Sequence, residues 1–224
     1  MPLPVSVIIP ALNEETRIAA TIDAAFAAGA AEVLVADGGS EDGTVSVAKA
    51  HRARVITGER IRARQLNRGA QEASHEHLIF LHADTLLPPG AAIAVMRALA
   101  TGAQFGGFQL EFIEQSRRLR FAAFMINRRT AMTGCPWGDQ AQFIRRETLL
   151  RVGGFADVPI MEDYDLAVRM KRSGKTAILP MRVRTSGRRF LEKGLVRTSA
   201  INWRVILGWR LGRDPEKLAR LYRG

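Results

Sequence analysis

The sequence predicts an α/β fold in which a mostly parallel central sheet is flanked by helices. Short apolar runs alternate with helical patterns through the first hundred residues, which indicates strand–helix–strand units with right-handed crossovers. The chain has 224 residues, 47% of them hydrophobic and 25% charged, which is typical of a globular protein with a full core. No stretch approaches the roughly 18 apolar residues of a membrane-spanning helix.

Four strands are expected in the first half of the chain. Each is an apolar or β-branched run that stops at turn-forming residues, and they cover Val5–Ile9, Glu32–Ala36, Ala53–Thr57 and His77–Leu81. The segments between and after them have helical signals. We expect helices capped by Asn13 and ended by Gly29, starting at Thr44, near Ile61–Ala73, and starting at Pro88-Pro89.

The pattern becomes less regular after about Gly102. Strands are expected over Gln104–Phe112 and Gln140–Ile144, with one or two more over Lys175–Arg184. Helices are expected over Arg117–Arg129, Glu162–Ser173 and Leu195–Leu211. No linker separates the halves, so we expect one compact domain over residues 1–181, with halves 1–102 and 103–181. Residues 182–224 form a basic helical extension that packs on the same domain.

The positive charge is concentrated at the C-terminal end. The net charge is +11, and residues 182–224 contain 12 Lys or Arg against 3 Asp or Glu. A basic end on a nearly neutral body predicts an anionic partner: nucleic acid, an anionic membrane surface or a phosphorylated acceptor. No nucleic-acid-reading motif accompanies the charge, so we expect no nucleic acid as a partner.

The cysteine count and the N-terminus predict a cytoplasmic protein. Cys135 is the single cysteine, so no internal disulfide forms, and we expect it to be a packed residue rather than a nucleophile. The first residues enter a strand at once and lack the regions of a signal peptide.

A carboxylate follows the most apolar of the expected strands. Leu78–Leu81 is long and bulky enough to be buried on both faces, and His82-Ala83-Asp84 comes directly after it. Open α/β sheets bind ligands at the carboxyl ends of their parallel strands. Asp84 therefore suits a divalent cation that carries a phosphorylated substrate. The alternative is an acid that caps the following helix.

Two further loops should open at the same edge of the sheet. Pro10–Glu15 follows the first strand, and a glycine-rich turn starting at Asp37 follows the second. Asp37 can accept hydrogen bonds from a nucleobase or ribose, and Gly38, Gly39 and Gly43 let the backbone approach a ligand closely. The alternative is that Asp37 only shapes its own turn.

Five motifs in order carry a family resemblance. They are V-S-V-I-I-P-A-L-N-E-E (Val5–Glu15), D-G-G-S-E-D-G-T (Asp37–Thr44), H-A-D (His82–Asp84), G-G-F (Gly153–Phe155) and M-E-D-Y-D (Met161–Asp165). Over Pro2 to Gly174 the chain resembles the catalytic domain of family 2 glycosyltransferases, and it is similar to a soluble subgroup with the same H-A-D metal motif. The resemblance implies the GT-A fold, which binds nucleoside-diphosphate sugars.

The resemblance also implies a donor site. Its nucleotide-facing positions correspond to Pro10, Asn13, Glu15, Asp37, Gly39, Arg62, Arg64 and Ala83. Asp84 matches the last acid of the D-x-D motif, which holds Mg²⁺ or Mn²⁺ against the diphosphate. His82 replaces the first acid of that motif; within the metal site we expect it to support the metal or contact the nucleotide rather than to be a direct ligand.

The same resemblance places a catalytic acid on the acceptor side. Asp163 matches the base of inverting members, and Glu162 is expected to orient it or to contact the acceptor. Both lie at a helix start, where the positive end of the helix dipole favours ionised carboxylates. The alternative is that both acids only complement that dipole.

Residues around these acids complete the expected site. The resemblance implies acceptor-facing residues just before the strand at Gln140, so Trp137, Asp139 and Gln140 are candidate acceptor contacts, although Trp137 is equally suited to packing. Arg188 and Arg189 follow on an expected mobile loop, where bidentate contact with the diphosphate is one role and a solvated basic patch is the other.

The sequence thus predicts an inverting, metal-dependent glycosyltransferase that uses a UDP- or GDP-linked sugar. The acceptor is left open between a lipid phosphate, a glycan and a small metabolite. The alternative is a non-catalytic nucleotide-sugar-binding or membrane-surface adaptor with the same fold. In the last long helix, Trp203 and Trp209 alternate with arginines. This pattern suits peripheral membrane contact, a packing helix with extended arginines, or a homodimer interface.

Overall fold

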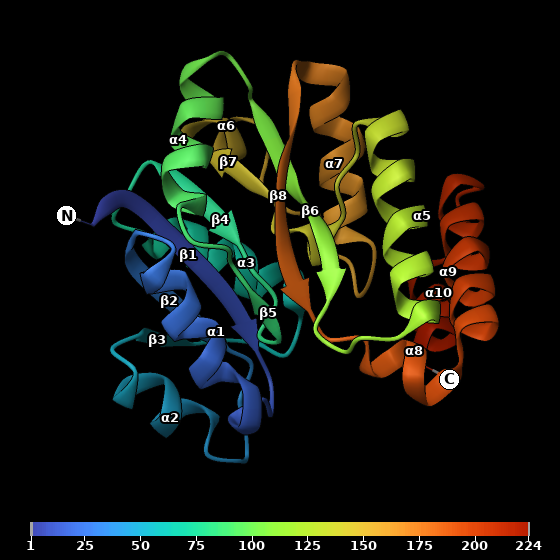
Figure 1. Cartoon of the computed structure of the whole chain (residues 1–224), viewed down its shortest axis with the longest axis horizontal. Helices are drawn as coiled ribbons and strands as arrows, with labels where there is room; N and C mark the ends of the chain where they lie inside the picture. The colour runs from blue at the N-terminus through green and yellow to red at the C-terminus, as the bar shows by residue number, and fades with distance from the viewer. Residues whose placement is uncertain (1, 224) are drawn as a thin grey trace.

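The computed structural model describes residues 2–223 and contains one eight-stranded mixed sheet (Figure 1). The strand order is β3-β2-β1-β4-β7-β6-β8-β5. The strands are β1 (Leu3–Ala11), β2 (Ala30–Asp37), β3 (Arg54–Thr57), β4 (His77–Phe80), β5 (Thr85–Leu86), β6 (Phe105–Phe112), β7 (Phe143–Arg145) and β8 (Thr176–Thr185).

Helices cover both faces of the sheet and form most of the C-terminal part. They are α1 (Glu15–Ala27), α2 (Thr44–Ala50), α3 (Arg62–Glu72), α4 (Ala91–Ala100), α5 (Arg117–Thr133), α6 (Arg146–Arg151), α7 (Glu162–Ser173), α8 (Arg188–Lys193), α9 (Leu195–Arg210) and α10 (Pro215–Arg223). A 3₁₀ turn, η1, covers Gly138–Gln140.

The first half of the sheet is parallel, as predicted. β1 pairs in parallel with β2 and with β4, and Val7 lies opposite both Val33 and Ile79. Val5–Ile9 is buried throughout, which explains the continuous apolar run of this central strand. As a result β1, β2 and β4 end at one edge, where the three predicted loops begin.

The second half of the sheet mixes directions. β7 is antiparallel to both β4 and β6, β5 is antiparallel to β8, and β6 and β8 are parallel. The predicted α/β class with a central sheet flanked by helices is confirmed. The parallel character, however, is confined to the β1–β4 group and the β6–β8 pair.

Two apolar cores lie on the two faces of the sheet. One joins α1, α4 and α5 to the sheet, and the other joins α3, α6 and α7 to the opposite face. A third cluster packs Ile201, Val205 and Leu218 of α9 and α10 against Met161 and Tyr164 at the start of α7. The C-terminal helices therefore lie against the part of the chain that carries Glu162 and Asp163.

Three local predictions were wrong. Asn13 does not cap α1, which begins at Glu15; Asn13 has a φ of 54° and bonds to the second loop instead. The expected strand over Gln140–Ile144 begins only at Phe143, because η1 and Ala141, with a φ of 47°, break the extended backbone. Arg188 and Arg189 lie in helix α8 and not in a loop.

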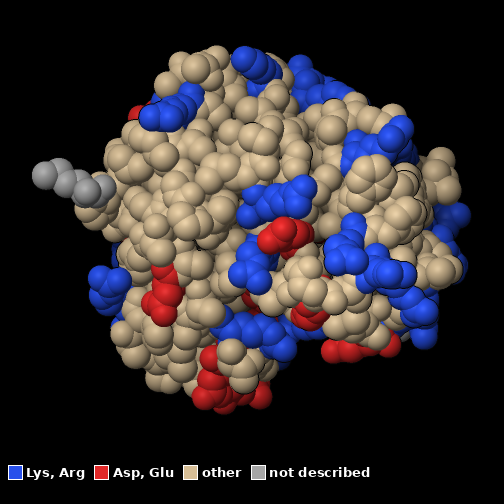
Figure 2. Space-filling model, in the orientation of Figure 1, with Lys and Arg blue, Asp and Glu red and all other residues tan. Residues whose placement is uncertain are grey.

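The basic C-terminal part is helical, as expected. The predicted boundary after residue 181 falls inside β8, and the helices begin at Arg188. Lys and Arg side chains gather on the side formed by α5, α8 and α9 (Figure 2). Within residues 2–223 no helix is long and apolar enough to cross a membrane. Membrane contact and dimer formation through this part stay predictions.

Candidate functional site

The first two loops at the carboxyl edge of the sheet are bonded to each other. The backbone N–H of Asn13 donates to Ser40 Oγ at 2.9 Å, and Asn13 Oδ1 accepts from the Glu41 N–H at 2.9 Å. Glu15 Oε2 accepts from the Gly43 N–H at 3.0 Å. Asn13 and Glu15 therefore fix the relative position of the two loops, which form one wall of the site.

Asp37 shapes the second loop from within. It is 2% exposed, and its Oδ2 accepts from the N–H groups of Gly39 at 2.9 Å and Ser40 at 3.0 Å. Gly39 has a φ of +84°, a conformation that favours glycine. Pro10 lies beside this loop, opposite Ala36 in the β1–β2 pair. The predicted contacts of Asp37, Gly39 and Pro10 with a nucleotide remain proposals.

The segment after β4 places a carboxylate in front of that wall. The Ala83 carbonyl accepts from Thr21 Oγ1 of α1 at 2.8 Å, which fixes the segment. Asp84 Oδ2 lies 3.7 Å from the Arg188 guanidinium, which also donates to Glu14 Oε1 at 2.8 Å. Burial raises the pKa of the Asp84 carboxyl, and Arg188 opposes that shift only in part. Two carboxylates thus share one guanidinium.

His82 is bonded to an arginine at the start of α3. Its Nε2 contacts the Arg62 guanidinium, which also donates to Glu162 Oε1 at 2.8 Å. Burial, together with the charges of Arg62 and Arg188, keeps the pKa of His82 well below its ordinary range, so the imidazole is neutral at pH 7. A guanidinium only donates, so His82 Nε2 is the acceptor. The predicted role of His82 at a metal or nucleotide stays a prediction.

The Arg62–Glu162 pair joins a partly exposed guanidinium to a buried carboxylate. Glu162 is 3% exposed, and burial raises the pKa of its carboxyl while Arg62 lowers it. Burial also disfavours the charge of Arg62, but Glu162 and Asp163 outweigh it and raise the pKa of the guanidinium. Arg62 therefore connects the segment after β4 to the start of α7.

Asp163 is positioned by backbone groups on both sides. Its Oδ2 accepts from the Gly138 N–H at 2.6 Å and its Oδ1 from the Tyr164 N–H at 2.7 Å. Its carbonyl accepts from Gln142 Nε2 at 2.9 Å. Met161, two residues earlier, has a φ of 71°, and such strain is common at functional sites. The carboxylate has a fixed direction at the start of α7.

The three predicted acceptor contacts have different environments. Gln140 is fully buried, and its amide bonds to Thr130 Oγ1 at 2.7 Å and to the Phe108 carbonyl at 3.0 Å. The Trp137 ring stacks on the Arg129 guanidinium at 3.3 Å. Asp139 Oδ1 is buried, with no hydrogen-bond partner among residues 2–223. Gln140 is thus used by the core, whereas Trp137 and Asp139 line the side toward Asp163.

Arg64 and Arg189 lie apart from these groups. Arg64 donates to Asp157 Oδ1 at 2.8 Å and also contacts Glu59, on the surface. Arg189 stacks on the Tyr222 ring at 3.4 Å and donates to the Tyr222 carbonyl at 2.9 Å. Arg188, in contrast, lies within ion-pair distance of Asp84, at 3.7 Å from its Oδ2.

The donor set at Asp84 fits a hard divalent cation that a substrate also ligates. No group of three or more His, Cys, Asp or Glu within residues 2–223 forms a complete protein cage. Mg²⁺ in particular is commonly bound by one or two carboxylates together with substrate phosphates and waters. Asp84 supplies such a carboxylate, while His82 Nε2 is engaged by Arg62.

The model of glycosyl transferase family 2 matches residues 6–151, more than half of the chain. This protein belongs to glycosyl transferase family 2. The predicted family is therefore confirmed. A search of curated protein sequences found no match.

Solved structures with the same fold are distant in sequence. Glucosyl-3-phosphoglycerate synthase from Mycobacterium tuberculosis, solved with phosphoglyceric acid, is 23% identical and aligns over 94% of this chain and 80% of its own, with a TM-score of 0.64. The mannosyltransferase PcManGT from Pyrobaculum calidifontis, in complex with GDP-Man and Mn²⁺, is 22% identical over 100% and 69%, with a TM-score of 0.68. S. aureus TarS is 16% identical over 82% and 37%, with a TM-score of 0.66. These likenesses establish the fold.

Several residues of this family 2 glycosyltransferase were not predicted as site residues. Glu14 pairs with Arg188, Gly138 and Gln142 bond to Asp163, and Arg129 stacks on Trp137. The Glu14-Glu15 pair and the glycine in W-G-D were visible signals. Gln142 and Arg129 carried none, because their roles depend on contacts with residues distant in the sequence.

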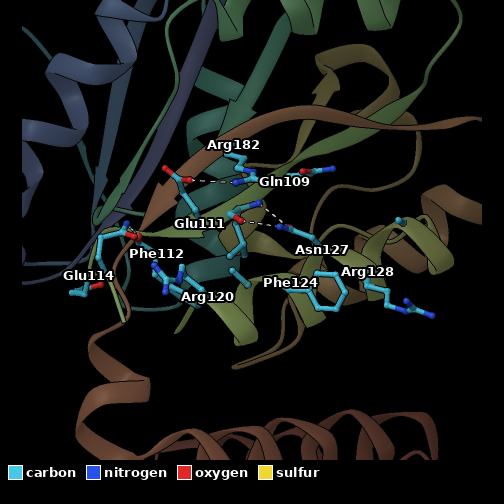
Figure 3. A pocket seen from close by; sticks show the side chains of 13 residues that line it. Gln109, Glu111, Phe112, Glu114, Arg120, Phe124, Asn127, Arg128 and Arg182 are labelled. Atoms are coloured by element: carbon cyan, nitrogen blue, oxygen red, sulfur yellow. Dashed lines mark hydrogen bonds and ion pairs between the residues drawn. The ribbon is translucent and has the colours of Figure 1, made fainter. Parts of the chain in front are cut away.

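One cavity of the glycosyltransferase lies away from these groups. It has a volume of about 500 Å³ and lies between β6, β8 and α5 (Figure 3). Glu111 and Arg182 pair across it, and Asn127 bonds to the β6 backbone at 2.9 Å. None of the predicted site residues lines it, and its three arginines (Arg120, Arg128 and Arg182) face two glutamates (Glu111 and Glu114).

Gly138 is a position where a side chain cannot fit. A Cβ there would lie 2.7 Å from Asp163 Oδ2 and 2.9 Å from both the Arg62 guanidinium and His82 Nε2. We expect Gly138→Ala to lower the turnover number of the glycosyltransferase at least about tenfold, since a small displacement of catalytic groups has large effects. Gly102→Ala is the control for general destabilisation, because its Cβ would meet nothing within 4 Å while its φ of +94° strains any side chain, a strain that Gly138 does not have. Turnover equal to wild type in Gly138→Ala contradicts this arrangement.

Asp139 makes the stability depend on pH. Burial raises the pKa of Asp139 to about 6, with a further contribution from Asp163, against an ordinary value of 3.8. The folded state binds this proton more tightly than the unfolded state does. The contribution of Asp139 to the free energy of unfolding is therefore fully present below pH 3.8 and is lost as the pH rises through 6. We expect the stability advantage of Asp139→Asn over wild type to grow by about 2 kcal/mol between pH 4 and pH 7. Urea unfolding at both pH values measures it, and a constant difference contradicts it.

Proposed function

We propose that this protein transfers a sugar from a UDP- or GDP-linked donor to an acceptor, with inversion and with the help of a divalent cation. One observation carries the proposal: the continuous contact from His82 through Arg62 to Glu162. This contact joins the carboxylate-bearing segment after β4 to the acid at the start of α7. A donor site and a base are required on opposite sides of the reacting carbon, and this chain of contacts fixes their separation.

The donor is assigned to the loops at the ends of β1, β2 and β4. Membership of family 2 supports this class of substrate. The M. tuberculosis synthase has been solved with Mn²⁺ and UDP-Glc, and PcManGT with GDP-Man and Mn²⁺, which supports both nucleotides as candidates. Pro10, Asp37, Gly39 and Ala83 then line the nucleotide side, while Asn13 and Glu15 keep the two loops together.

Asp84 is the residue that would hold Mn²⁺ or Mg²⁺, and the cation would neutralise charge that develops on the leaving diphosphate. Arg188 stands beside Asp84 with a permanent positive charge, and its planar guanidinium suits phosphate oxygens. Arg62 adds a second guanidinium from the opposite side. Both arginines offer guanidinium N–H groups to a diphosphate, and each is also paired with a carboxylate.

Asp163 is the proposed base. The N–H groups of Gly138 and Tyr164 each occupy one lone pair, and the remaining lone pairs can accept the proton of an acceptor hydroxyl. The buried Glu162 pairs with Arg62 and so positions the start of α7. As the proton passes to Asp163, the hydroxyl oxygen attacks the anomeric carbon and the nucleoside diphosphate leaves on the opposite side.

Calorimetric titration with UDP and GDP, each with and without Mn²⁺, tests the donor assignment. We expect one nucleotide to bind much more tightly when Mn²⁺ is present. Binding without any sugar transfer favours the adaptor function instead. Failure of both nucleotides to bind overturns the proposal.

A further inference from the structure

A second cavity lies between the ends of α5, α7 and α9, next to the proposed base. Its volume is about 960 Å³. Trp137 and Tyr164 form the wall nearest Asp163: Gly138, which follows Trp137, and Tyr164 itself donate their N–H groups to the Asp163 carboxylate. A molecule in this cavity can therefore extend toward Asp163 on the acceptor side.

The charged side chains around this cavity are mostly basic. Arg129, Lys171, Arg172 and Arg210 line it, and Asp165 is its one acid among residues 2–223. Asp165 is already neutralised, because its Oδ2 accepts from Arg169 Nε at 2.7 Å. Four cations and one acid line this cavity, whereas three cations and two acids line the one in Figure 3, so this cavity is the more strongly positive of the two and attracts anions.

A buried donor in the cavity wall has no partner. Arg129 Nε makes no hydrogen bond within residues 2–223, although its guanidinium stacks on Trp137 and donates to Gln140 Oε1 at 3.1 Å. Burial lowers the pKa of Arg129 to about 10, so the group stays charged at neutral pH. A buried cation with an unused donor is costly, and a bound oxyanion would satisfy it.

Aromatic rings form the rest of the wall. Trp137 and Tyr164 meet edge to face at 6.1 Å, and Arg210 Nε donates to the Tyr164 hydroxyl at 2.8 Å. Trp203 and Trp209 of α9 also line the cavity. Basic groups interleaved with flat apolar rings suit a ligand that joins an anionic group to a carbon skeleton.

We propose that this cavity binds the acceptor, and that the acceptor carries a phosphate or carboxylate group which Arg129, Lys171, Arg172 and Arg210 recognise. The inference rests on the proposed glycosyl transfer and narrows its acceptor to an anionic molecule. The anionic group lies in the cavity, and the acceptor hydroxyl lies at Asp163. A small metabolite and a lipid phosphate share this chemistry.

Tryptophan fluorescence reports on this cavity directly, since all three tryptophans of the chain line it. We expect phosphoglycerate to change the fluorescence of the full-length protein in a saturable way in the presence of Mn²⁺ and UDP, and glycerol to have no effect. A water-soluble short-chain phosphatidic acid, titrated in parallel, distinguishes a lipid phosphate from a small metabolite by its relative affinity.

A matched pair of double variants tests the role of charge. Lys171→Gln/Arg172→Gln removes two exposed cations of the cavity, and Lys49→Gln/Arg97→Gln removes two exposed cations elsewhere. The first is expected to weaken binding of the preferred anion about tenfold, and the second to leave it within roughly twofold. Equal effects of the two variants, or glycerol binding as tightly as the anions, overturn the inference.

The same titrations separate this inference from the proposed function. Binding of UDP with Mn²⁺ is measured by calorimetry on the same samples. If UDP or GDP binds and no anion changes the tryptophan fluorescence, the acceptor inference is wrong and the donor assignment stands. If anions bind in the cavity but neither nucleotide binds, the proposed glycosyl transfer fails.

Discussion

Replacing Asp163 with Asn is expected to lower the turnover number for sugar transfer about 10²- to 10⁴-fold, the range that a general base contributes. The amide oxygen can still accept from one of the two backbone N–H groups that contact Asp163, but it cannot take a proton from the acceptor hydroxyl. Steady-state kinetics with the donor identified by titration measure the loss.

Donor binding separates a chemical effect from a structural one. The Kd for the nucleotide with Mn²⁺ is expected to be unchanged in Asp163→Asn, because the donor lies at the other end of the site. Asp214→Asn, an acid that bonds to the N–H of Glu216 at the start of α10, is the control and should keep full turnover. Sugar transfer at the wild-type rate in Asp163→Asn would show that Asp163 is not the base.

Replacing Asp84 with Ala is expected to abolish the increase in melting temperature that Mn²⁺ and a nucleoside diphosphate produce together. Asp84 is the one carboxylate in the segment between β4 and β5. Within residues 2–223 no group of three acids, histidines or cysteines could hold the cation in its place. Loss of a supporting residue alone typically costs metal affinity about 10- to 100-fold, so loss of the ligand should cost at least about 100-fold.

The melting temperature of Asp84→Ala without ligand is the control for folding. Arg188 keeps its contact with Glu14 when Asp84 is removed, so Asp84→Ala should fold and melt near the wild-type temperature without ligand. Asp23→Ala, an exposed acid on α1, is the control and should show the full shift. A full ligand-induced shift in Asp84→Ala places the cation elsewhere.

The features that local patterns determine were predictable from the sequence. The continuous apolar runs at Val5–Ile9 and Leu78–Leu81 indicated buried parallel strands, and such strands end at one edge of the sheet. That rule brought the loops after β1 and β2 and the carboxylate of Asp84 to the same edge. The order of five motifs then identified the family, which the family model confirmed.

The features that depend on distant contacts were not predictable. Arg188 bonds to Glu14 across 174 positions in the chain, and Arg62 bonds to Glu162 across 100. Nothing in the local sequence of His82 indicates that its ring accepts from Arg62. The strand expected over Gln140–Ile144 exists as β7, but its antiparallel direction was not predicted and its start was placed too early, because η1 and Ala141 break the extended backbone.

Gln140 shows why residue type alone is a poor guide to a binding role. The family resemblance made it a candidate acceptor contact, together with Trp137 and Asp139. In the structure its amide oxygen accepts from Thr130, Arg129 and the Trp137 N–H, and its amide nitrogen donates to Phe108, so it supports the wall of the site. Its assignment as an acceptor contact stays a prediction.

Release of nucleoside diphosphate from sugar donors tests the central claim most directly. The full-length protein is incubated with Mn²⁺ and a panel of UDP- and GDP-linked sugars, with and without an anionic acceptor such as phosphoglycerate. We predict slow release of UDP or GDP from one donor, acceleration by the anionic acceptor, and loss of both in Asp84→Ala and Asp163→Asn. If no donor is bound or turned over, or if both variants release it at the wild-type rate, the proposed site is wrong.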